Sequence, residues 1–154
     1  MSTPTWDKFS NRRIDKLHPA IRTDAMDFIN AVEQELHIRL RVTQGFRSFA
    51  EQDALFAQGR STAGKIVTNA RGGQSYHNFG LAIDVCEIRG AEAIWDCDWA
   101  KIAPIGKGLG WEWGGDWVSF IDKPHFQKVF GKTTEQLRQA YVLLADPNDY
   151  VAVT

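Results

Sequence analysis

Two histidines and two aspartates of this chain have types and spacing that suggest a metal centre. His77 and Asp84 stand near the two ends of the stretch QSYHNFGLAIDV, with Gly80 between them. Farther along, His125 follows Asp122 by three residues in DKPHFQ. A catalytic zinc takes three protein ligands, from His nitrogen or carboxylate oxygen, and leaves a fourth position open for water. His77, Asp84 and His125 could supply these ligands, and Gly80 would let the backbone turn tightly between the first two.

Asp122 has a different possible role, as a carboxylate that stands beside the metal without binding it. Zinc lowers the pKa of a bound water molecule to near neutrality, so that the water becomes a nucleophile. A neighbouring carboxylate can accept the proton of that water and pass it to a leaving amine. The four residues together would therefore hydrolyse an amide bond.

Spacing alone leaves simpler alternatives open for these residues. His77 could be an ordinary loop histidine, and Asp84 could be a buried aspartate paired with an arginine. The two other histidines, His18 and His37, have no carboxylate or second histidine at a ligand spacing. The two cysteines are too few for a disulfide framework and lack zinc-ligand partners at short spacing, so we expect two free thiols.

The elements that must position these side chains can be read from hydrophobic periodicity and capping patterns. Apolar spacing predicts a helix over residues 19–36, and alternation predicts a half-buried strand over 37–44. Capping boxes at Ser48/Glu51 and Thr133/Gln136 predict helices over about 49–58 and 134–145. We further expect a loop over 60–74, a strand over 81–88, a helix over 98–109 with a break or new start at Pro104, and a strand region over 117–130 interrupted at Pro124. This order predicts an α+β fold, with helices packed on a small antiparallel sheet that carries a single zinc site.

Composition limits the partners of the protein. The 154 residues suit one domain, with a motif-bearing core over about 40–130. The net charge is -1, from 18 basic and 19 acidic residues, which gives no general attraction to nucleic acid. No segment reaches the ~20 apolar residues of a membrane span, and the N-terminus lacks the apolar region of a secretory signal. We expect a monomer that is made in a cytoplasm and does not insert into a membrane.

Three segments resemble a known family in the same order along the chain. The stretch SYHNFGLAID matches the Ser-x-His-x-x-Gly-x-Ala-x-Asp motif of the zinc D-alanyl-D-alanine peptidases. The upstream QGFRSFAEQDALFAQGRS resembles the arginine-containing segment of that family, and the downstream GLGWEWGGDWVSFIDKPHFQ resembles the segment with its last zinc ligand. The amino acids in these motifs are most similar to those of the phage L-alanyl-D-glutamate endolysins and their bacterial relatives.

The resemblance implies a role for each matching residue. His77, Asp84 and His125 match the ligands of one zinc ion, and Asp122 matches the catalytic acid/base, where many relatives carry Glu. Arg47 matches the arginine that stabilises charge on the scissile carbonyl. Two further candidates concern the substrate: Ser75 matches a serine that contacts it, and Gln52 would either face the same groove or lie on a solvated helix face.

The function implied by the resemblance is hydrolysis of the peptide stem of bacterial peptidoglycan, at the L-Ala–D-Glu bond, by a phage endolysin that acts on the cell wall after release from the host cytoplasm. Two other functions stay open: a D-Ala–D-Ala carboxypeptidase or dipeptidase, and a non-catalytic zinc-containing wall-binding module. A metal-free domain with His77 and His125 in its core is also open. Trp113 and Trp117 could line the groove or belong to the core.

Overall fold

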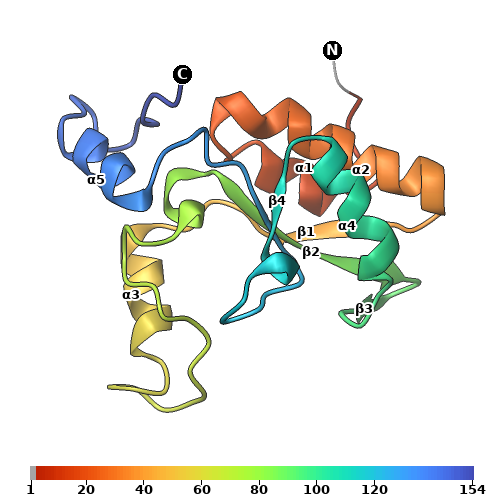
Figure 1. The fold of residues 1–154 in the computed structure, drawn as a ribbon, viewed down its shortest axis with the longest axis horizontal. Coiled ribbons are helices and arrows are strands. Elements are labelled where there is room, and N and C mark those ends of the chain that lie inside the picture. The colour runs from red at the N-terminus through yellow and green to blue at the C-terminus, as the bar shows by residue number, and fades with distance from the viewer. Residues whose placement is uncertain (1–2) are drawn as a thin grey trace.

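The computed structural model describes residues 3–154 and has the expected α+β architecture (Figure 1). Five strands form one sheet in the order β1-β2-β5-β4, with β3 paired to β2, and every pairing is antiparallel. The strands are β1 Leu40–Gln44, β2 Ala82–Arg89, β3 Glu92–Ile94, β4 Glu112–Trp113 and β5 His125–Gln127. The helices are α1 Lys8–Ile14, α2 Arg22–Leu36, α3 Phe49–Ala57, α4 Trp99–Gly108 and α5 Thr134–Val142, with short 3-10 turns η1 Pro19–Ile21, η2 Tyr76–Phe79 and η3 Gly114–Asp116.

One face of the sheet packs on α2 and α4. The fully buried Phe28 of α2 meets the ring of Phe126 of β5 edge to face, with centroids 4.8 Å apart. Ile83 and Val85 of β2 belong to the same core cluster, as does Ile102 of α4. Successive side chains of a strand point to opposite faces of the sheet. The neighbours of these core residues, Asp84 and His125 among them, therefore point to the other face.

Helix α1 covers the edge of β1 and was not expected from the sequence. The Asp7 side chain caps this helix by accepting a hydrogen bond from the amide of Ser10. The Ser10 hydroxyl in turn accepts a hydrogen bond from the amide of Val42 on β1, at 2.9 Å. Asp7 also binds Arg41 of β1 through two oxygens, at 2.8 and 3.0 Å. The position of this helix is therefore fixed by contacts between residues that are 32 to 34 positions apart in the sequence.

The predicted helices and strands exist, with corrections at their boundaries. The predicted helix over 19–36 is a 3-10 turn followed by α2, and the strand predicted over 37–44 begins only at Leu40. His37 adopts a left-handed conformation, with φ of 57°, and ends α2 there. Pro104 does not break its helix, because α4 continues through it. The strand region predicted over 117–130 is mostly turns, with β5 as its only strand.

Both predicted capping boxes are present. Ser48 and Glu51 cap α3 reciprocally, and Thr133 and Gln136 do the same for α5. Both cysteines are free and buried, as expected. None of the helices within residues 3–154 has the length and apolar character needed to cross a membrane.

Candidate active site

His77 is held by a short turn whose end requires a glycine. The Ser75 side chain begins η2 by accepting a hydrogen bond from the amide of His77, and Gly80 ends it with φ of 69°. A Cβ atom at Gly80 would lie 2.5 Å from the amide nitrogen of His18, so a larger residue does not fit. The ring Nδ1 of His77 lies 2.8 Å from the carbonyl oxygen of Gly45. This contact leaves Nε2 to face the neighbouring strands.

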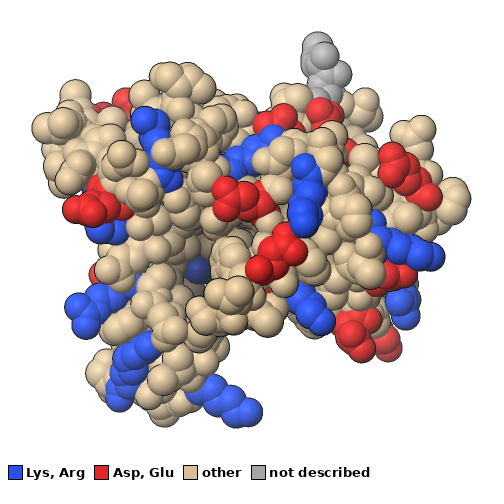
Figure 2. Space-filling model, in the orientation of Figure 1, with Lys and Arg blue, Asp and Glu red and all other residues tan. Residues whose placement is uncertain are grey.

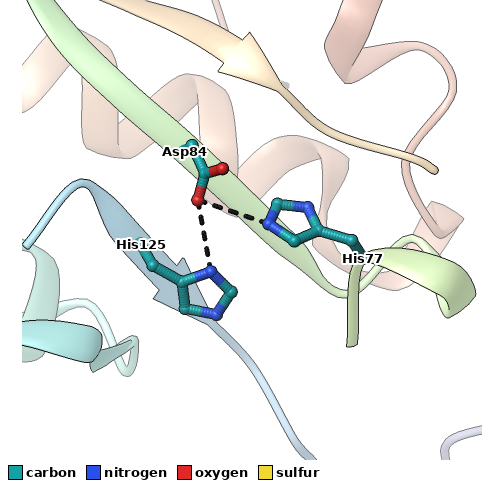
Figure 3. A group of neighbouring side chains, drawn as sticks. All are labelled: His77, Asp84 and His125. Carbon is teal, nitrogen blue, oxygen red and sulfur yellow. Dashed lines mark hydrogen bonds and ion pairs between the residues drawn. The ribbon is translucent and has the colours of Figure 1, made fainter. Parts of the chain in front are cut away.

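Asp84 and His125 are brought together by the register of the sheet. They are direct partners in the pairing of β2 with β5 and point away from the core. His125 Nδ1 lies 3.2 Å from Asp84 Oδ1, and His77 Nε2 lies 3.3 Å from the same oxygen (Figure 3). The candidate ligand atoms of the three residues all lie within 4.8 Å of one another. Both histidines are about 95% buried or more.

The donor set suits a zinc ion. The second ring nitrogen of each histidine faces an acceptor: Gly45 O for His77, and Gln127 Oε1, at 2.7 Å, for His125. Histidines that bind metals commonly donate their other N–H to such an acceptor, which fixes the tautomer and the ring orientation. Burial favours a higher pKa for Asp84, but the two histidines outweigh it and hold the pKa well below its usual range. The carboxylate is therefore ionised and ready for a cation.

Asp122 lies at the rim of this cluster. Its Oδ2 is 4.0 Å from His125 Nδ1, and its side chain is 41% exposed. Burial and the neighbouring Asp84 carboxylate raise the pKa of Asp122, against the opposing effects of the histidines and Arg47. A raised pKa brings a carboxylate closer to the range in which it both accepts and releases a proton.

Arg47 enters the cluster from the other side. Its Nη2 lies 3.9 Å from Asp84 Oδ2, and its Nη1 donates to Gln52 Oε1 at 3.0 Å. Burial lowers the pKa of the guanidinium, although Asp84 and other carboxylates oppose this. An arginine keeps its charge in proteins even so. The side chain is therefore a fixed cation beside the candidate metal ligands.

Gln52 lies behind Arg47 and not in the open groove. The residue is fully buried, and its amide nitrogen donates to the carbonyl oxygen of Ala70 at 2.9 Å. Its oxygen accepts from Arg47. The sequence left two alternatives for Gln52, contact with the substrate in the groove and a place on a solvated helix face. Neither describes this buried position. The geometry assigns Gln52 to the positioning of Arg47.

A cleft of about 920 Å³ opens over the cluster. The surface is hollowed between the rest of the molecule and the lobe formed by α3 and its following loop (Figure 2). His77, Asp84, Asp122, His125 and Arg47 lie in it, and Ser75 lines it as the sequence suggested. Trp117 also lines it, and its ring lies 5.0 Å from that of His125. Trp113, by contrast, stacks on Phe126 of the core, with its Nε1 donating to Lys123 O.

The residues of the cleft that were not identified from the sequence include Gln127, Trp95 and Phe120. Gln127 is two residues after His125 on the same strand, so period-two spacing alone could have placed both on one face. Trp95 and Phe120 also line the cleft. Both belong to segments without regular periodicity, and no sequence signal pointed to them.

The chain is similar to known peptidases in sequence and in structure. A family model described as D-alanyl-D-alanine carboxypeptidase matches residues 68–128, which contain all three candidate ligands. The peptidoglycan L-alanyl-D-glutamate endopeptidase CwlK of Bacillus subtilis (strain 168) is 45% identical over 124 residues, covering 73% of this chain and 74% of that protein.

Two further relatives extend the comparison. The L-alanyl-D-glutamate peptidase of Listeria phage A118 is 40% identical over 68 residues, 40% of this chain and 24% of that protein. The crystal structure of the Serratia marcescens L-Ala D-Glu endopeptidase ChiX superimposes with a TM-score of 0.60 at 25% identity, over 82% of this chain and 90% of that one.

Proposed function

Since the chain belongs to the D-alanyl-D-alanine carboxypeptidase family, as a relative of its L-alanyl-D-glutamate endopeptidases, we propose that it cleaves the L-Ala–D-Glu bond of bacterial peptidoglycan with one bound zinc ion. The observation that carries the proposal is the set of His77, Asp84 and His125 in one cleft, with both histidines buried. Asp122 and Arg47 lie beside that set, where a peptidase needs a proton acceptor and a cation.

The charges in the cleft favour an endopeptidase over a carboxypeptidase. A carboxypeptidase must bind a free terminal carboxylate close to the bond that it cuts, which requires a cation there. Among the described residues that line the cleft, Arg47 is the only lysine or arginine. Arg47 already lies beside Asp84, and we assign it to the scissile carbonyl. No second cation in the lining is left to pair directly with a terminal carboxylate.

The residues divide the chemistry between them. His77 Nε2, one Asp84 oxygen and His125 Nδ1 would hold the zinc ion, which when bound supplies Lewis acidity toward water and the scissile carbonyl. Asp122 takes the proton of the attacking water and returns it to the leaving amine of D-Glu. Arg47 stabilises negative charge that develops on the carbonyl oxygen, where a preoriented cation costs no reorganisation.

We further propose that the protein acts as an endolysin, released from the host cytoplasm onto the cell wall during lysis by a phage. The phage relative supports this role. The bacterial relatives show that the same activity also occurs outside phages. Expression in a bacterium together with a membrane-permeabilising protein should cause lysis, whereas expression of the His77→Ala variant should not.

The scissile bond can be identified by mass spectrometry of digested peptidoglycan. We expect stem peptides that begin with D-Glu, and L-Ala that stays on the muramyl sugar. Removal of metal with a chelator should abolish this activity, and zinc should restore it. Release of D-Ala with the L-Ala–D-Glu bond intact would indicate a carboxypeptidase. Binding to the wall without any cleavage would indicate a non-catalytic module.

A further inference from the structure

We propose that Trp95, Trp117 and Phe120 form a wall of the cleft, here called the aromatic wall, that binds the sugar strand of peptidoglycan. The inference rests on the proposed function and adds a direction to it: the glycan lies on the aromatic wall, and the peptide stem leaves along the opposite side. All three rings line the cleft that contains the candidate zinc ligands.

Two of the three rings of the aromatic wall are about half exposed. Trp95 is 49% exposed and Phe120 is 50% exposed. Trp117 is half-buried, since its ring packs on His125. Sugars present apolar C–H faces, and burial of these faces against aromatic rings removes apolar surface of both partners from water. The proposed substrate is a peptide linked to a glycan. The sugars of that glycan therefore have the apolar faces that the exposed rings of the cleft can bind.

The backbone of Phe120 has a conformation that residues other than glycine rarely adopt. Its φ is 52°, in the left-handed region. The loop is tied at its base by Gly114, whose carbonyl oxygen accepts from the amides of Trp117 and Asp122. A Cβ atom at Gly114 would lie 2.2 Å from Asp122 O, so glycine permits this close approach. Strain of this kind persists where surrounding structure enforces it, and it concentrates at ligand sites.

The segment on the opposite side of the cleft, residues 58–75, is basic, although its three cations do not line the cleft. Residues 58–75 contribute Gln58, Val67, Asn69 and Ser75 to the lining, and this segment contains Arg60, Lys65 and Arg71 but no acidic residue. None of these three cations takes part in an ion pair within residues 3–154. Figure 2 shows basic side chains on the lobe formed by α3 and its following loop.

The segments that carry the aromatic wall are acidic. Residues 90–98 and 114–122 contain five acidic residues and no lysine or arginine: Glu92, Asp96, Asp98, Asp116 and Asp122. Lys101 and Lys107 from α4 pair with Asp98 and Asp116, at 3.9 and 2.7 Å. The pairing reduces the negative charge on this side but does not reverse it.

This asymmetry sets the direction of the substrate. On the L-Ala side of the scissile bond is the muramyl sugar, which is neutral once its lactyl carboxyl group is in the amide. On the other side, D-Glu keeps one carboxylate free, and this group is ionised at neutral pH. Arg60, Lys65 and Arg71 lie outside the lining and favour an anionic stem on their side of the cleft by long-range attraction, and a neutral sugar is tolerated beside acids. The glycan therefore lies on the aromatic wall.

The test compares two substrates that differ only in the sugar: a disaccharide-linked stem peptide, and the same stem with an acetyl group in place of the sugar. We expect the wild-type protein to show a higher kcat/KM for the sugar-linked substrate, mainly through a lower KM. Trp95→Ala and Phe120→Ala should each reduce this preference by about two- to tenfold, the value of one aromatic contact. Phe9→Ala, which removes an exposed ring of α1 remote from the cleft, should leave the preference unchanged.

A binding measurement separates this inference from the proposed function. Glycan strands stripped of peptide should bind the metal-loaded wild-type protein and shift tryptophan fluorescence, with weaker binding in the Trp95→Ala and Phe120→Ala variants. This result would support the aromatic wall even if the scissile bond proved different. Equal kcat/KM for the two substrates in the wild-type protein, or equal glycan binding by wild type and both variants, would overturn the inference.

Discussion

His125 and Gln127 lie on the same face of β5, and His125 Nε2 is 2.7 Å from Gln127 Oε1. Both side chains are more than 90% buried. An amide oxygen can only accept a hydrogen bond, so this contact places the ring proton of a neutral His125 on Nε2. The contact leaves the Nδ1 lone pair directed at Asp84 and the candidate metal position.

Replacement of Gln127 with leucine should therefore weaken zinc binding. Loss of an outer hydrogen-bond partner of a metal ligand typically costs about 10- to 100-fold in affinity. Gln127→Glu keeps an acceptor oxygen and should retain most of the affinity. Chelator competition would measure both, with Gln139→Leu on the exposed face of α5 as control. Equal zinc affinity of Gln127→Leu and wild type would show that the contact does not orient the ligand.

The two carboxylates of the site should respond differently to the same substitution. Asp122→Asn should keep zinc bound but reduce kcat by about 10²–10⁴-fold, because it removes the proton acceptor. Asp84→Asn should weaken zinc binding itself. Zinc content and kcat of both variants would be compared with those of Asp15→Asn, an exposed residue after α1. If Asp122→Asn lost the metal and Asp84→Asn kept it, the two assignments would be reversed.

The sequence predicted the parts of the site that depend on local patterns. The capping boxes of α3 and α5 use residues three apart, and the strand of Asp84 is rich in apolar residues. Such features require no knowledge of distant contacts. The roles proposed for His77, Asp84 and His125 rest instead on ordered motifs, because residue spacing alone does not give the register that pairs β2 with β5.

Other parts depend on contacts between distant residues and could not be predicted. β3 and β4 contain three and two residues, too few to show a period. Helix α1 is fixed by Asp7 and Ser10 through partners on β1, and the position of Gln52 behind Arg47 depends on the loop that contains Ala70. The conformation of the 114–124 loop depends on the hydrogen bonds that Gly114 O accepts, and these bonds produce no periodic pattern in the sequence.

The Asp7–Arg41 pair should make stability depend on pH. Burial favours a higher pKa for Asp7, but hydrogen bonds from Arg41 and Ser10 outweigh it, so that the pKa lies below its ordinary value. A lowered pKa in the folded state means that the stabilisation is full above the unfolded-state pKa of about 3.9 and is lost as pH falls through the folded-state pKa. Asp7→Asn should lower the unfolding free energy by about 1–3 kcal/mol at pH 7.

Urea denaturation of wild type and Asp7→Asn at several pH values would test this dependence. The difference between the two proteins should be constant from pH 7 to about pH 5 and should shrink below about pH 4. Asp15→Asn serves again as the exposed control. A difference that stayed constant down to pH 2 would mean that the ionised carboxylate of Asp7 is not the source of the stability.

The last prediction concerns the pair of Arg47 and Gln52. Arg47→Ala should reduce kcat by about 10²–10³-fold with a smaller change in KM, because the guanidinium is assigned to charge that develops in the transition state. Gln52→Met keeps the shape of the buried side chain but removes its contacts with Arg47 and Ala70. This variant should lower kcat less than Arg47→Ala does, while zinc affinity stays unchanged.

A double-mutant cycle distinguishes positioning from a purely structural role. If Gln52 acts through Arg47, then Gln52→Met should have little further effect on kcat once Arg47 is alanine. Thermal unfolding would show how much stability Gln52→Met loses by itself, with the exposed Gln34→Met of α2 as control. Effects on kcat that add in the double variant would mean that Gln52 supports the fold independently of Arg47. An unchanged kcat in Arg47→Ala would instead remove the arginine from the reaction and leave it as a structural partner of Asp84.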